Sequence, residues 1–396
     1  MASLTPMMQQ YLEIKEQYND CILFFRLGDF YEMFFSDAEL ASRELEITLT
    51  GKDCGLEERA PMCGVPFHSA DSYIAKLINK GYKVAICEQI EDPALAKGLV
   101  KRDVIRIVTP GTVTDSTMLD EKKNNYLMSI YKSKTYYGIA CVDLTTGEFL
   151  STYITFGNTF SKLMDEIAKF SPSEIVVNGE FFHDENLKST LKKRFDVYIS
   201  SIEDRFFEKD FSIQKVRDYF KDHVIEENAF DLYINASGAL LEYLEQTQKV
   251  NLSHIQSFSV YRIEEYMVLD LATRRNLELT ETMREKNRKG SLLWVLDRTM
   301  TSMGGRTLRK WIEQPLINLH DIKDRLNAVN EFKEKFMVRT EVRELLKAVY
   351  DIERLMSKVV LGSANCRDLI SIKNSIGQVP YIKELICHFN ADLNVL

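Results

Sequence analysis

The run FFRLGDFYEMFF, residues 24–35, carries the most information about this chain. It places a large aromatic residue, Phe30, two positions before a carboxylate, Glu32, and just after a glycine, Gly28. In an extended backbone, side chains at positions i and i+2 point to the same side. The pattern therefore predicts that Phe30 and Glu32 address one small target together, the ring by stacking and the carboxyl group by hydrogen bonding.

The same run also fits a second interpretation, in which it only builds the core. Cys21–Leu27 is then a buried strand that leads into a helix, and Asp29 and Glu32 form the capping box of that helix. The apolar face of the helix would consist of Tyr31, Phe34, Phe35, Ala38 and Leu45. Because an aromatic residue beside a strand usually belongs to the core, the run taken alone favours this second interpretation.

Five further motifs change that balance. They are APMCGVPFH at 60–68, VAICEQ at 84–89, RIVTPGT at 106–112, ASGALLEYL at 236–244 and GGRTLRKW at 304–311. In order and spacing, the set resembles the N-terminal part of the MutS family of bacterial DNA mismatch-repair proteins. The resemblance covers nearly the whole chain. It implies that Phe30 is a wedge that enters the minor groove and stacks on a mispaired base, and that Glu32 contacts that base.

Physical arguments agree with this implied role. A mismatched step costs less energy to open than a paired step, so an apolar wedge reads the deformability of DNA and not its sequence. Phosphates repel a carboxylate, and we therefore expect Glu32 to bind as the neutral acid and to donate a hydrogen bond to a purine acceptor. Possible contacts to the DNA backbone come from Lys76, Lys101, Arg102 and Arg106.

The net charge of -8 argues against nucleic acid only if charge is spread evenly, and it is not. Residues 270–310 hold ten Lys or Arg against five Asp or Glu, whereas residues 196–231 hold five against ten. This asymmetry suits a protein that touches DNA at limited places and presents an acidic face elsewhere.

Pattern changes along the chain predict three parts, with α/β architecture in the first two and all-α architecture in the third. Residues 1–112 form an α/β mismatch-recognition domain, residues 113–125 a linker, and residues 126–248 a second α/β domain. In this second domain, Tyr126–Ile130, Tyr137–Leu144 and Gly147–Tyr153 are expected to be consecutive strands. Residues 249–396 form a helical core or lever domain that is expected to be incomplete.

The helical prediction for the third part rests on apolar periodicity. Five residues fall near one face of a helix, namely Tyr266, Leu269, Thr273, Leu277 and Leu279. A run at 284–289, REKNRK, adds a basic helix end. The same all-α part keeps open the alternative of a helical protein-binding adaptor.

Catalysis finds little support in the residues. The only Gly-Lys pair, Gly51-Lys52, lacks the upstream glycine of a phosphate-binding loop, so we expect no ATP hydrolysis by this chain. The strand GIACVD, which ends at Asp143, resembles the first strand of a ribonuclease-H-like domain, and a metal-dependent nuclease is therefore an alternative. Two-metal cleavage needs further carboxylates, however, and the later strand ends in Asn178 where a second acid is wanted. We therefore prefer a non-catalytic connector of similar fold.

The family resemblance implies several partners. These are mismatched duplex DNA, MutL bound through the connector domain, and a second copy of the full-length protein. ATP and Mg²⁺ belong to a C-terminal ATPase domain of the family, and no metal or cofactor site is expected here. The seven scattered cysteines predict neither a zinc site nor a disulfide framework. No apolar window is long enough for a membrane span and no signal sequence is evident, so a cytoplasmic location is expected.

Overall fold

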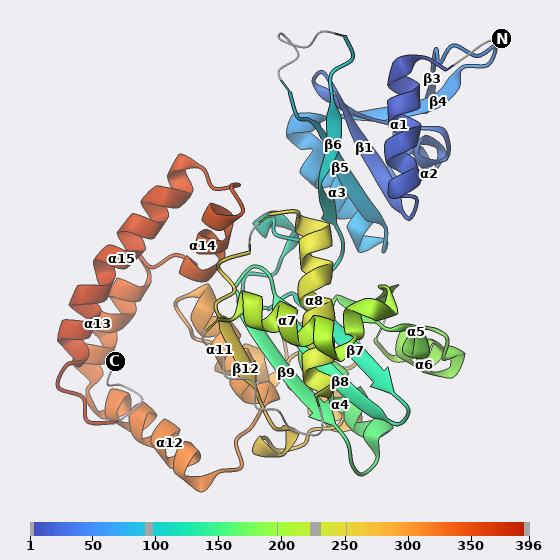
Figure 1. The fold of residues 1–396 in the computed structure, drawn as a ribbon. Coiled ribbons are helices and arrows are strands. Elements are labelled where there is room, and N and C mark those ends of the chain that lie inside the picture. Colours follow the sequence, from blue (N-terminus) through green and yellow to red (C-terminus); the bar gives the residue numbers. More distant parts are fainter. Residues whose placement is uncertain (1–3, 92–97, 196, 222–230, 251, 392–396) are drawn as a thin grey trace. The chain divides into compact units, whose positions relative to one another are not determined.

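The computed structural model describes residues 4–91, 98–195, 197–221, 231–250 and 252–391 (Figure 1). The chain divides into two compact units. The first holds Met1–Met118 with Leu241–Val250, and the second holds Leu119–Leu240 with Asn251–Leu396. Within the described ranges, no helix is both long and apolar enough to cross a membrane.

The first unit is built on a six-stranded mixed sheet with strand order β3-β4-β2-β1-β5-β6. Strands β1 and β5 are parallel, and the other neighbours are antiparallel. In chain order its elements are α1 (Pro6–Gln17), β1 (Cys21–Leu27), β2 (Phe30–Phe34), α2 (Phe35–Leu45), β3 (Thr50–Lys52), β4 (Ala60–Pro66), α3 (Ala70–Asn79), β5 (Lys83–Gln89) and β6 (Arg102–Val108). The α/β architecture predicted for this part is confirmed.

Helices cover both faces of this sheet. Helix α1, which begins with a proline at its first turn, lies against β1 (Figure 1). Its Met8, Tyr11 and Ile14 pack with Leu23 and Phe25 of that strand. Side chains alternate along a strand, so the residues between these belong to the other face. On that face the Cys63 thiol donates to the carbonyl oxygen of Ala38 in α2. We refer to the two sides as the α1 face and the α2/α3 face.

The run 24–35 forms a tight hairpin followed by a helix. Leu27 pairs directly with Phe30, so the turn consists of Gly28 and Asp29, and Gly28 takes the positive φ of +57° that such turns require. The strand predicted at Cys21–Leu27 is confirmed. The capping box is wrong, because Glu32 lies within strand β2 and the helix begins only at Phe35.

The second unit contains another six-stranded sheet, with strand order β11-β10-β7-β8-β9-β12. Strands β7, β8 and β9 form antiparallel hairpins, whereas β10, β11 and β12 pair in parallel with their neighbours. Its elements up to the sheet's last strand are β7 (Tyr126–Ser133), β8 (Tyr136–Asp143), β9 (Glu148–Ile154), α4 (Thr159–Phe170), β10 (Glu174–Val177), α5 (Gly179–Phe182), α6 (Glu185–Phe195), β11 (Tyr198–Ser201), α7 (Lys209–Tyr219), the first half of α8 (Leu232–Gln248) and β12 (Ser257–Val260). The second half of α8, from Leu241 on, belongs to the first unit. The three consecutive strands predicted here are confirmed.

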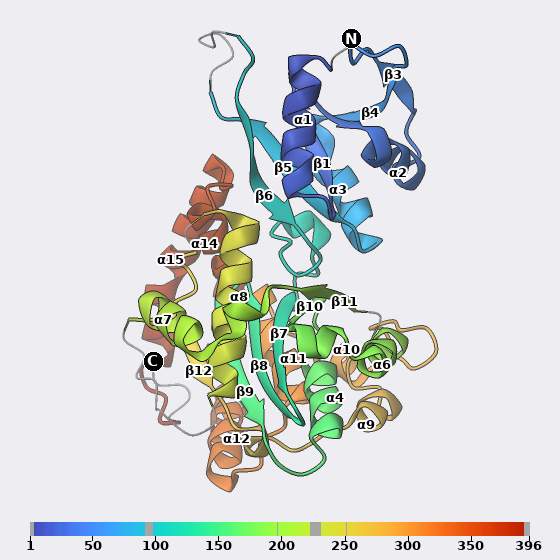
Figure 2. The ribbon, with the colours of Figure 1, turned by 45° about the vertical axis from the view of Figure 1, so that its right-hand side comes forward.

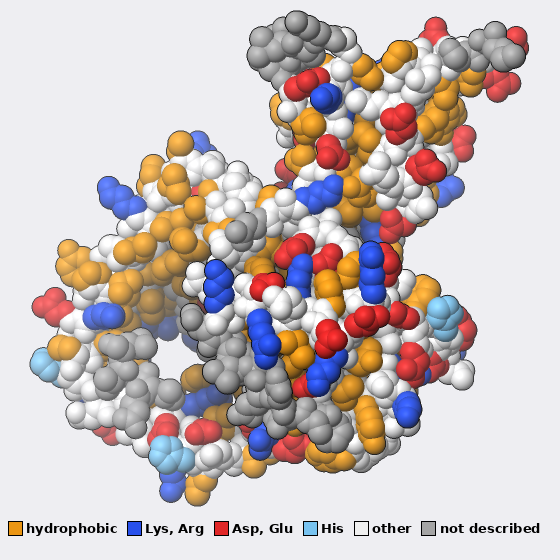
Figure 3. Space-filling view, viewed as in Figure 1, with side chains coloured by type: hydrophobic (Ala, Val, Ile, Leu, Met, Phe, Trp, Pro, Cys, Tyr) orange, Lys and Arg blue, Asp and Glu red, His pale blue; other side chains and the backbone are white. Residues whose placement is uncertain are grey.

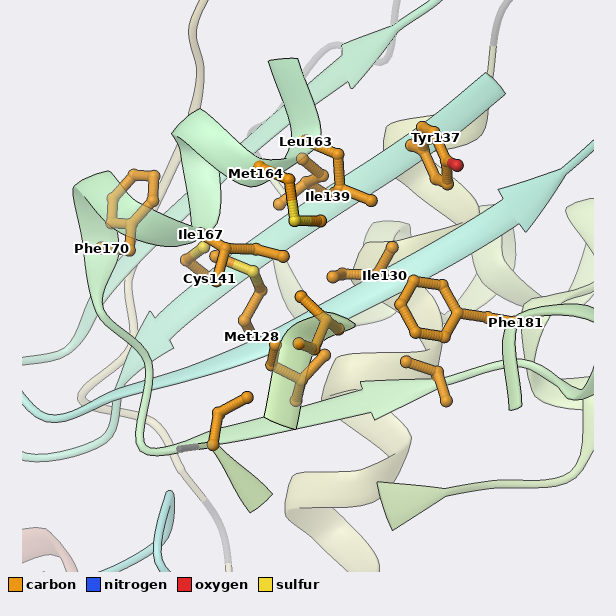
Figure 4. Packing of buried hydrophobic residues seen from close by; sticks show 14 of the residues in the cluster. Met128, Ile130, Tyr137, Ile139, Cys141, Leu163, Met164, Ile167, Phe170 and Phe181 are labelled. Carbon is orange, nitrogen blue, oxygen red and sulfur yellow. The ribbon is translucent and has the colours of Figure 1, made fainter. Parts of the chain in front are cut away.

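Two layers of helices enclose this sheet. On one side, Met128, Ile130 and Ile139 pack against Leu163 and Ile167 of α4 (Figure 4). On the other side, α8 runs beside β8 and β9 (Figure 2). The hydroxyl of Ser237 in α8 lies 2.8 Å from that of Ser151 in β9. An ideal Cβ built on Gly138 of β8 would lie 1.8 Å from the carbonyl oxygen of Leu232. The glycine therefore allows the first turn of α8 to approach the sheet.

The rest of the second unit is helical. Its helices are α9 (Leu271–Asn276), α10 (Leu292–Leu296), α11 (Ser302–Glu313), α12 (Leu319–Glu334), α13 (Phe336–Leu346), α14 (Ile352–Val360) and α15 (Cys366–Ile386). The helix expected over residues 266–279 is mostly wrong. Tyr266 instead forms a β-bridge with Leu316, the amide of Met267 donates to Pro315, and only the short α9 follows.

The last two helices expose much of their apolar surface. Figure 3 shows such side chains gathered over α14 and α15. The exposed residues on these helices are Met356, Val359, Leu369, Ile370, Ile376, Val379 and Tyr381. The helical character expected for the third part is thus found from α9 to α15, and its last two helices leave much of their apolar surface exposed.

The segment 119–125, predicted as part of a linker, is held by charged groups of the helical part. Arg306 forms a bidentate pair with Asp351 at 2.7 and 2.8 Å and donates to the carbonyl oxygen of Glu121. Lys122 lies 3.1 Å from the carboxylate of Asp297, which also accepts hydrogen bonds from Thr299. These contacts fix the segment within the second unit.

We expect Asp297→Asn to destabilise the second unit at neutral pH. Burial by itself raises the pKa of Asp297, but hydrogen bonds from Thr299 and the Lys122 ammonium outweigh it and lower the pKa from 3.8 to about 2. The ionised carboxylate therefore contributes about 1 to 2 kcal/mol, fully present above the unfolded-state pKa and lost as the pH falls through the folded-state value.

Urea unfolding followed by tryptophan fluorescence measures this difference. Both tryptophans, Trp294 and Trp311, lie in the second unit, so their signal reports that unit. The control is Asp321→Asn on α12, where the carboxylate is exposed and a small effect is expected. Equal stability of the parent and the Asp297 variant at neutral pH would contradict the prediction.

Candidate nucleic-acid interface

Phe30 and Glu32 lie on the same face of strand β2, as the spacing predicts. Phe30 pairs with Leu27 and Glu32 with Phe25, which places both on the α1 face of the sheet. The Phe30 ring is 46% exposed at the turn end of the hairpin. Phe30 is therefore not a core residue, and it is available to a ligand at the tip of a strand whose other end is buried.

The turn beside Phe30 is fixed by Arg26 from the opposite face. The Arg26 guanidinium donates to the carbonyl oxygen of Gly28 at 2.5 Å, lies 3.5 Å from Glu88 and stacks 3.7 Å over the ring of Phe67. Tyr31 also donates to Glu88. Burial, and then the acceptor Glu88, raise the pKa of the Tyr31 phenol, so it stays a neutral donor. These contacts hold the exposed Phe30 on a rigid hairpin.

Glu32 has a charged partner within the same unit. Its Oε2 lies 2.5 Å from Nζ of Lys52 on the edge strand β3. Strand β4 runs between β3 and β2, and the residue of β4 opposite Glu32 is Gly64. A Cβ at position 64 would lie 3.4 Å from Cγ of Glu32. The same Cβ would lie 3.3 Å from the carbonyl oxygen of Tyr31, so the glycine permits a close approach of β4 to the backbone of β2.

Two of the four basic residues predicted to contact the DNA backbone lie near this face. Arg102 stacks over Phe25 on the α1 face, and it donates to the carbonyl oxygen of Arg26 at 2.8 Å and to the side chain of Gln10 at 3.0 Å. Its guanidinium therefore already braces β6 against β1 and α1. Lys101, which precedes this strand, is exposed, and its contact to the DNA backbone stays a prediction.

The other two basic residues, Arg106 and Lys76, lie on the α2/α3 face. A β-bulge shifts the pairing of β5 with β6, so that Arg106 opposes Ile86 while Val104 opposes Cys87. Arg106 is consequently half-buried and donates to Thr114, and burial lowers its pKa. Lys76 is exposed on helix α3. The structure thus separates these two residues from Phe30 and Glu32, and a phosphate contact by either one stays a prediction.

The residue that suggested a nuclease, Asp143, serves a structural purpose. Its carboxylate is fully buried and accepts hydrogen bonds from the side chain of Asn124 and from both the amide and the hydroxyl of Thr145. Asn178, at the end of β10, binds the backbone of Lys132 through both of its side-chain polar atoms.

Among the described residues, the one cluster of three possible metal ligands is His320, Asp321 and Asp324 on α12, and it does not include Asp143. Two-metal cleavage requires converging carboxylates. The hydrogen bonds of Asp143 and Asn178 to neighbouring groups favour a structural role for both residues.

Sequence reasoning did not find Lys52, Gly64 or Arg26. Arg26 offers a signal, because a cation interrupts the apolar alternation of a buried strand. Gly64 stands inside the motif APMCGVPFH, where a glycine in a strand indicates a close approach of neighbouring groups. Lys52 offers no signal, since a single lysine in a three-residue strand is ordinary on an edge.

Comparison with known proteins assigns all three parts of the chain. Models of three MutS domains match in order, MutS domain I over residues 5–117, MutS domain II over 125–256 and MutS domain III over 272–395. The chain belongs to the MutS family. The hairpin with Phe30 and Glu32 thus lies in MutS domain I, and the sheet with Asp143 lies in MutS domain II.

Relatives named DNA mismatch repair protein MutS match over essentially the whole chain. The relative from Acetivibrio thermocellus is 91% identical over 396 residues, which is all of this chain and 46% of the relative. The relative from Ruminiclostridium cellulolyticum is 70% identical over 392 residues, 99% of this chain and 45% of the relative. The one from Alkaliphilus oremlandii is 53% identical over 398 residues, with 99% and 45% covered. The chain therefore spans a little under half the length of these curated relatives.

Proposed function

We propose that this chain recognises mismatched or unpaired bases in duplex DNA, the first step of DNA mismatch repair. The observation that carries the proposal is the exposed ring of Phe30 at the tip of a braced hairpin, with the carboxyl group of Glu32 on the same face. Phe30 enters the minor groove and stacks on the mispaired base, and Glu32 contacts that base. The membership in the MutS family and the names of its relatives support this role.

The energetics of such a wedge favour a defective site. Inserting the ring requires unstacking one base step, which costs less where the bases are already mispaired. Stacking on the ring returns about 1 to 3 kcal/mol. A paired step needs the same insertion at a higher cost, and so the same hairpin binds it more weakly. The hairpin must hold its shape for this difference to be expressed, and Arg26 provides that rigidity.

The proposal assigns no reaction to these 396 residues. ATP and Mg²⁺ act, by family resemblance, in a domain of the longer MutS relatives outside the matched part. We further propose that MutL binds through the second unit, which carries a ribonuclease-H-like connector fold, and that the longer protein works as a homodimer.

Binding to matched and mismatched duplexes of otherwise identical sequence tests the proposal. The variant Glu32→Gln tests the part that Glu32 plays in the preference for mismatched duplex. The amide keeps the shape and hydrogen-bonding ability of the side chain but removes its negative charge. We expect affinity for paired duplex to rise about threefold to tenfold and the preference for mismatched duplex to fall, because charge repulsion no longer penalises the paired site. Fluorescence anisotropy with labelled duplexes at fixed salt measures both quantities.

The matched control is Glu44→Gln. Glu44 is also paired with a lysine of the first unit, Lys80 at 3.1 Å, but it lies on helix α2 away from strand β2. This variant should bind both duplexes as the parent does. If Glu32→Gln binds paired duplex more weakly than the parent, the assigned role of Glu32 is wrong.

A further inference from the structure

The carboxylate of Glu32 is held by a cation before any DNA is bound. Lys52 Nζ lies 2.5 Å from Glu32 Oε2, and the two side chains are 32% and 17% exposed. The ammonium also lies 5.5 Å from the ring centroid of Phe34, on the same face. Glu32 Oε1, in contrast, accepts no hydrogen bond from the described residues. The pair therefore engages one carboxylate oxygen and leaves the other for a ligand.

This arrangement depends on strands that are distant in the sequence. Lys52 lies on β3, opposite Ala60 of β4, and its side chain reaches over β4 towards Glu32 on β2. Gly64 of β4, which pairs with Glu32, approaches the backbone of β2 closely. The ammonium thus has a defined position relative to the hairpin that carries Phe30.

The position of this cation answers a problem of charge. A bare carboxylate in a groove is repelled by two rows of phosphates, and removing it from water without a partner is costly. An adjacent ammonium offsets part of the negative charge that the phosphates meet at Glu32. Lys52, 2.5 Å from Glu32, is placed to supply this counter-charge from within the protein.

We propose that Lys52 is a positioning residue for base recognition: it neutralises and orients Glu32, so that the free Oε1 faces the displaced base. The proposal rests on the mismatch-recognition function above. It differs from an ordinary phosphate contact, because Lys52 then acts on DNA binding through Glu32. The effect of removing Lys52 must therefore depend on whether Glu32 is present.

A double-mutant cycle tests this dependence. The parent, Lys52→Met, Glu32→Gln and the double variant are titrated against a labelled duplex with one G·T mismatch and against its fully paired counterpart. We expect Lys52→Met to weaken mismatched binding about fivefold to tenfold when Glu32 is present, because the uncompensated carboxylate repels the DNA. In the Glu32→Gln background the same change should cost less than about twofold.

Two further variants separate charge from fold. Lys52→Arg restores a cation at the same place and should return affinity to within about twofold of the parent. Lys80→Met removes the cation of the separate Lys80–Glu44 pair in the same unit and should leave both affinities unchanged. Circular dichroism of each variant verifies the fold.

The outcomes are distinct. An equal loss from Lys52→Met in both backgrounds, or no rescue by arginine, overturns the proposal and makes Lys52 an independent contact or a structural residue. A parent chain that binds mismatched and paired duplexes equally overturns the proposed function itself. A parent that prefers the mismatch, together with a Lys52 effect that vanishes in the Glu32→Gln background, supports both.

Discussion

Replacing Phe30 by alanine is expected to abolish the preference for mismatched duplex while leaving weak binding that depends on salt. Stacking of one base on an aromatic ring is worth about 1 to 3 kcal/mol, so affinity for mismatched duplex should fall about tenfold or more. Affinity for paired duplex should change little, since contacts to phosphates supply that binding. Titration of both duplexes at two salt concentrations measures the two contributions separately.

The same substitution at Phe156 provides a matched control. Phe156 is 59% exposed, more than Phe30, but it belongs to the second unit. Phe156→Ala should therefore leave the preference intact. Phe30→Leu adds a second comparison, because leucine keeps apolar bulk without an aromatic face. If Phe30→Ala still prefers mismatched over paired duplex, Phe30 does not act as the inserted wedge, whatever the control shows.

Gly138→Ala is expected to destabilise the second unit strongly, by about 3 kcal/mol. A Cβ at this position would lie 1.8 Å from the carbonyl oxygen and 2.3 Å from the carbonyl carbon of Leu232. Both atoms belong to the backbone of α8, so no side-chain rotation relieves the clash and the helix must move away from the sheet. Urea unfolding followed by circular dichroism gives the change in the free energy of unfolding, and hydrogen exchange of β8 amides locates it.

The control is the same substitution in an open place. Gly377 lies inside helix α15, and nothing lies within 4 Å of a Cβ built there. Gly377→Ala should be neutral or stabilising by about 0.5 to 1 kcal/mol, because alanine is the better helix former. If the free energy of unfolding falls for Gly138→Ala and rises for Gly377→Ala, then the close approach of α8, and not the flexibility of glycine, makes Gly138 necessary. A neutral Gly138→Ala would contradict the packing of α8 described above.

A close approach like that at Gly138 also explains part of the family motif ASGALLEYL, residues 236–244. Gly238, inside α8, has Cα and Cβ of Ser212 within 2.5 Å of an ideal Cβ. Helix α7 therefore contacts α8 at a position where a larger side chain has no room. Residues 236–244 combine this small contact with large buried residues such as Leu240 and Leu244. The motif is thus a packing motif, although it helps to identify the family.

Local sequence patterns predicted several strands of this protein and its family. Alternation and turn chemistry predict the strand Cys21–Leu27, and the three consecutive strands from Tyr126 to Tyr153, because each choice depends on neighbouring residues. The spacing of Phe30 and Glu32 likewise places them on one face, since both lie in one strand. Motif order was enough to indicate the MutS family.

Tertiary structure decided which of these residues meet. One bulged residue in β6 sends Arg106 to the face opposite Arg102, although strict alternation would keep them together. The order of strands brings Lys52 to Glu32 across β4, and no local pattern encodes that meeting. Pairing of Tyr266 with Leu316 likewise replaces a helix that periodicity favours.

The physical reason is the range of the interactions. Strand alternation and hairpin turns depend on residues a few positions apart, so the sequence alone predicted the consecutive strands from Tyr126 to Tyr153. Ion pairs, bulges and helix-to-sheet approaches depend on groups that only strand order and register bring within reach. The shared face of Phe30 and Glu32 was therefore predictable from their spacing, whereas the exposure of Phe30 and the cation beside Glu32 were settled only when β2, β3 and β4 paired.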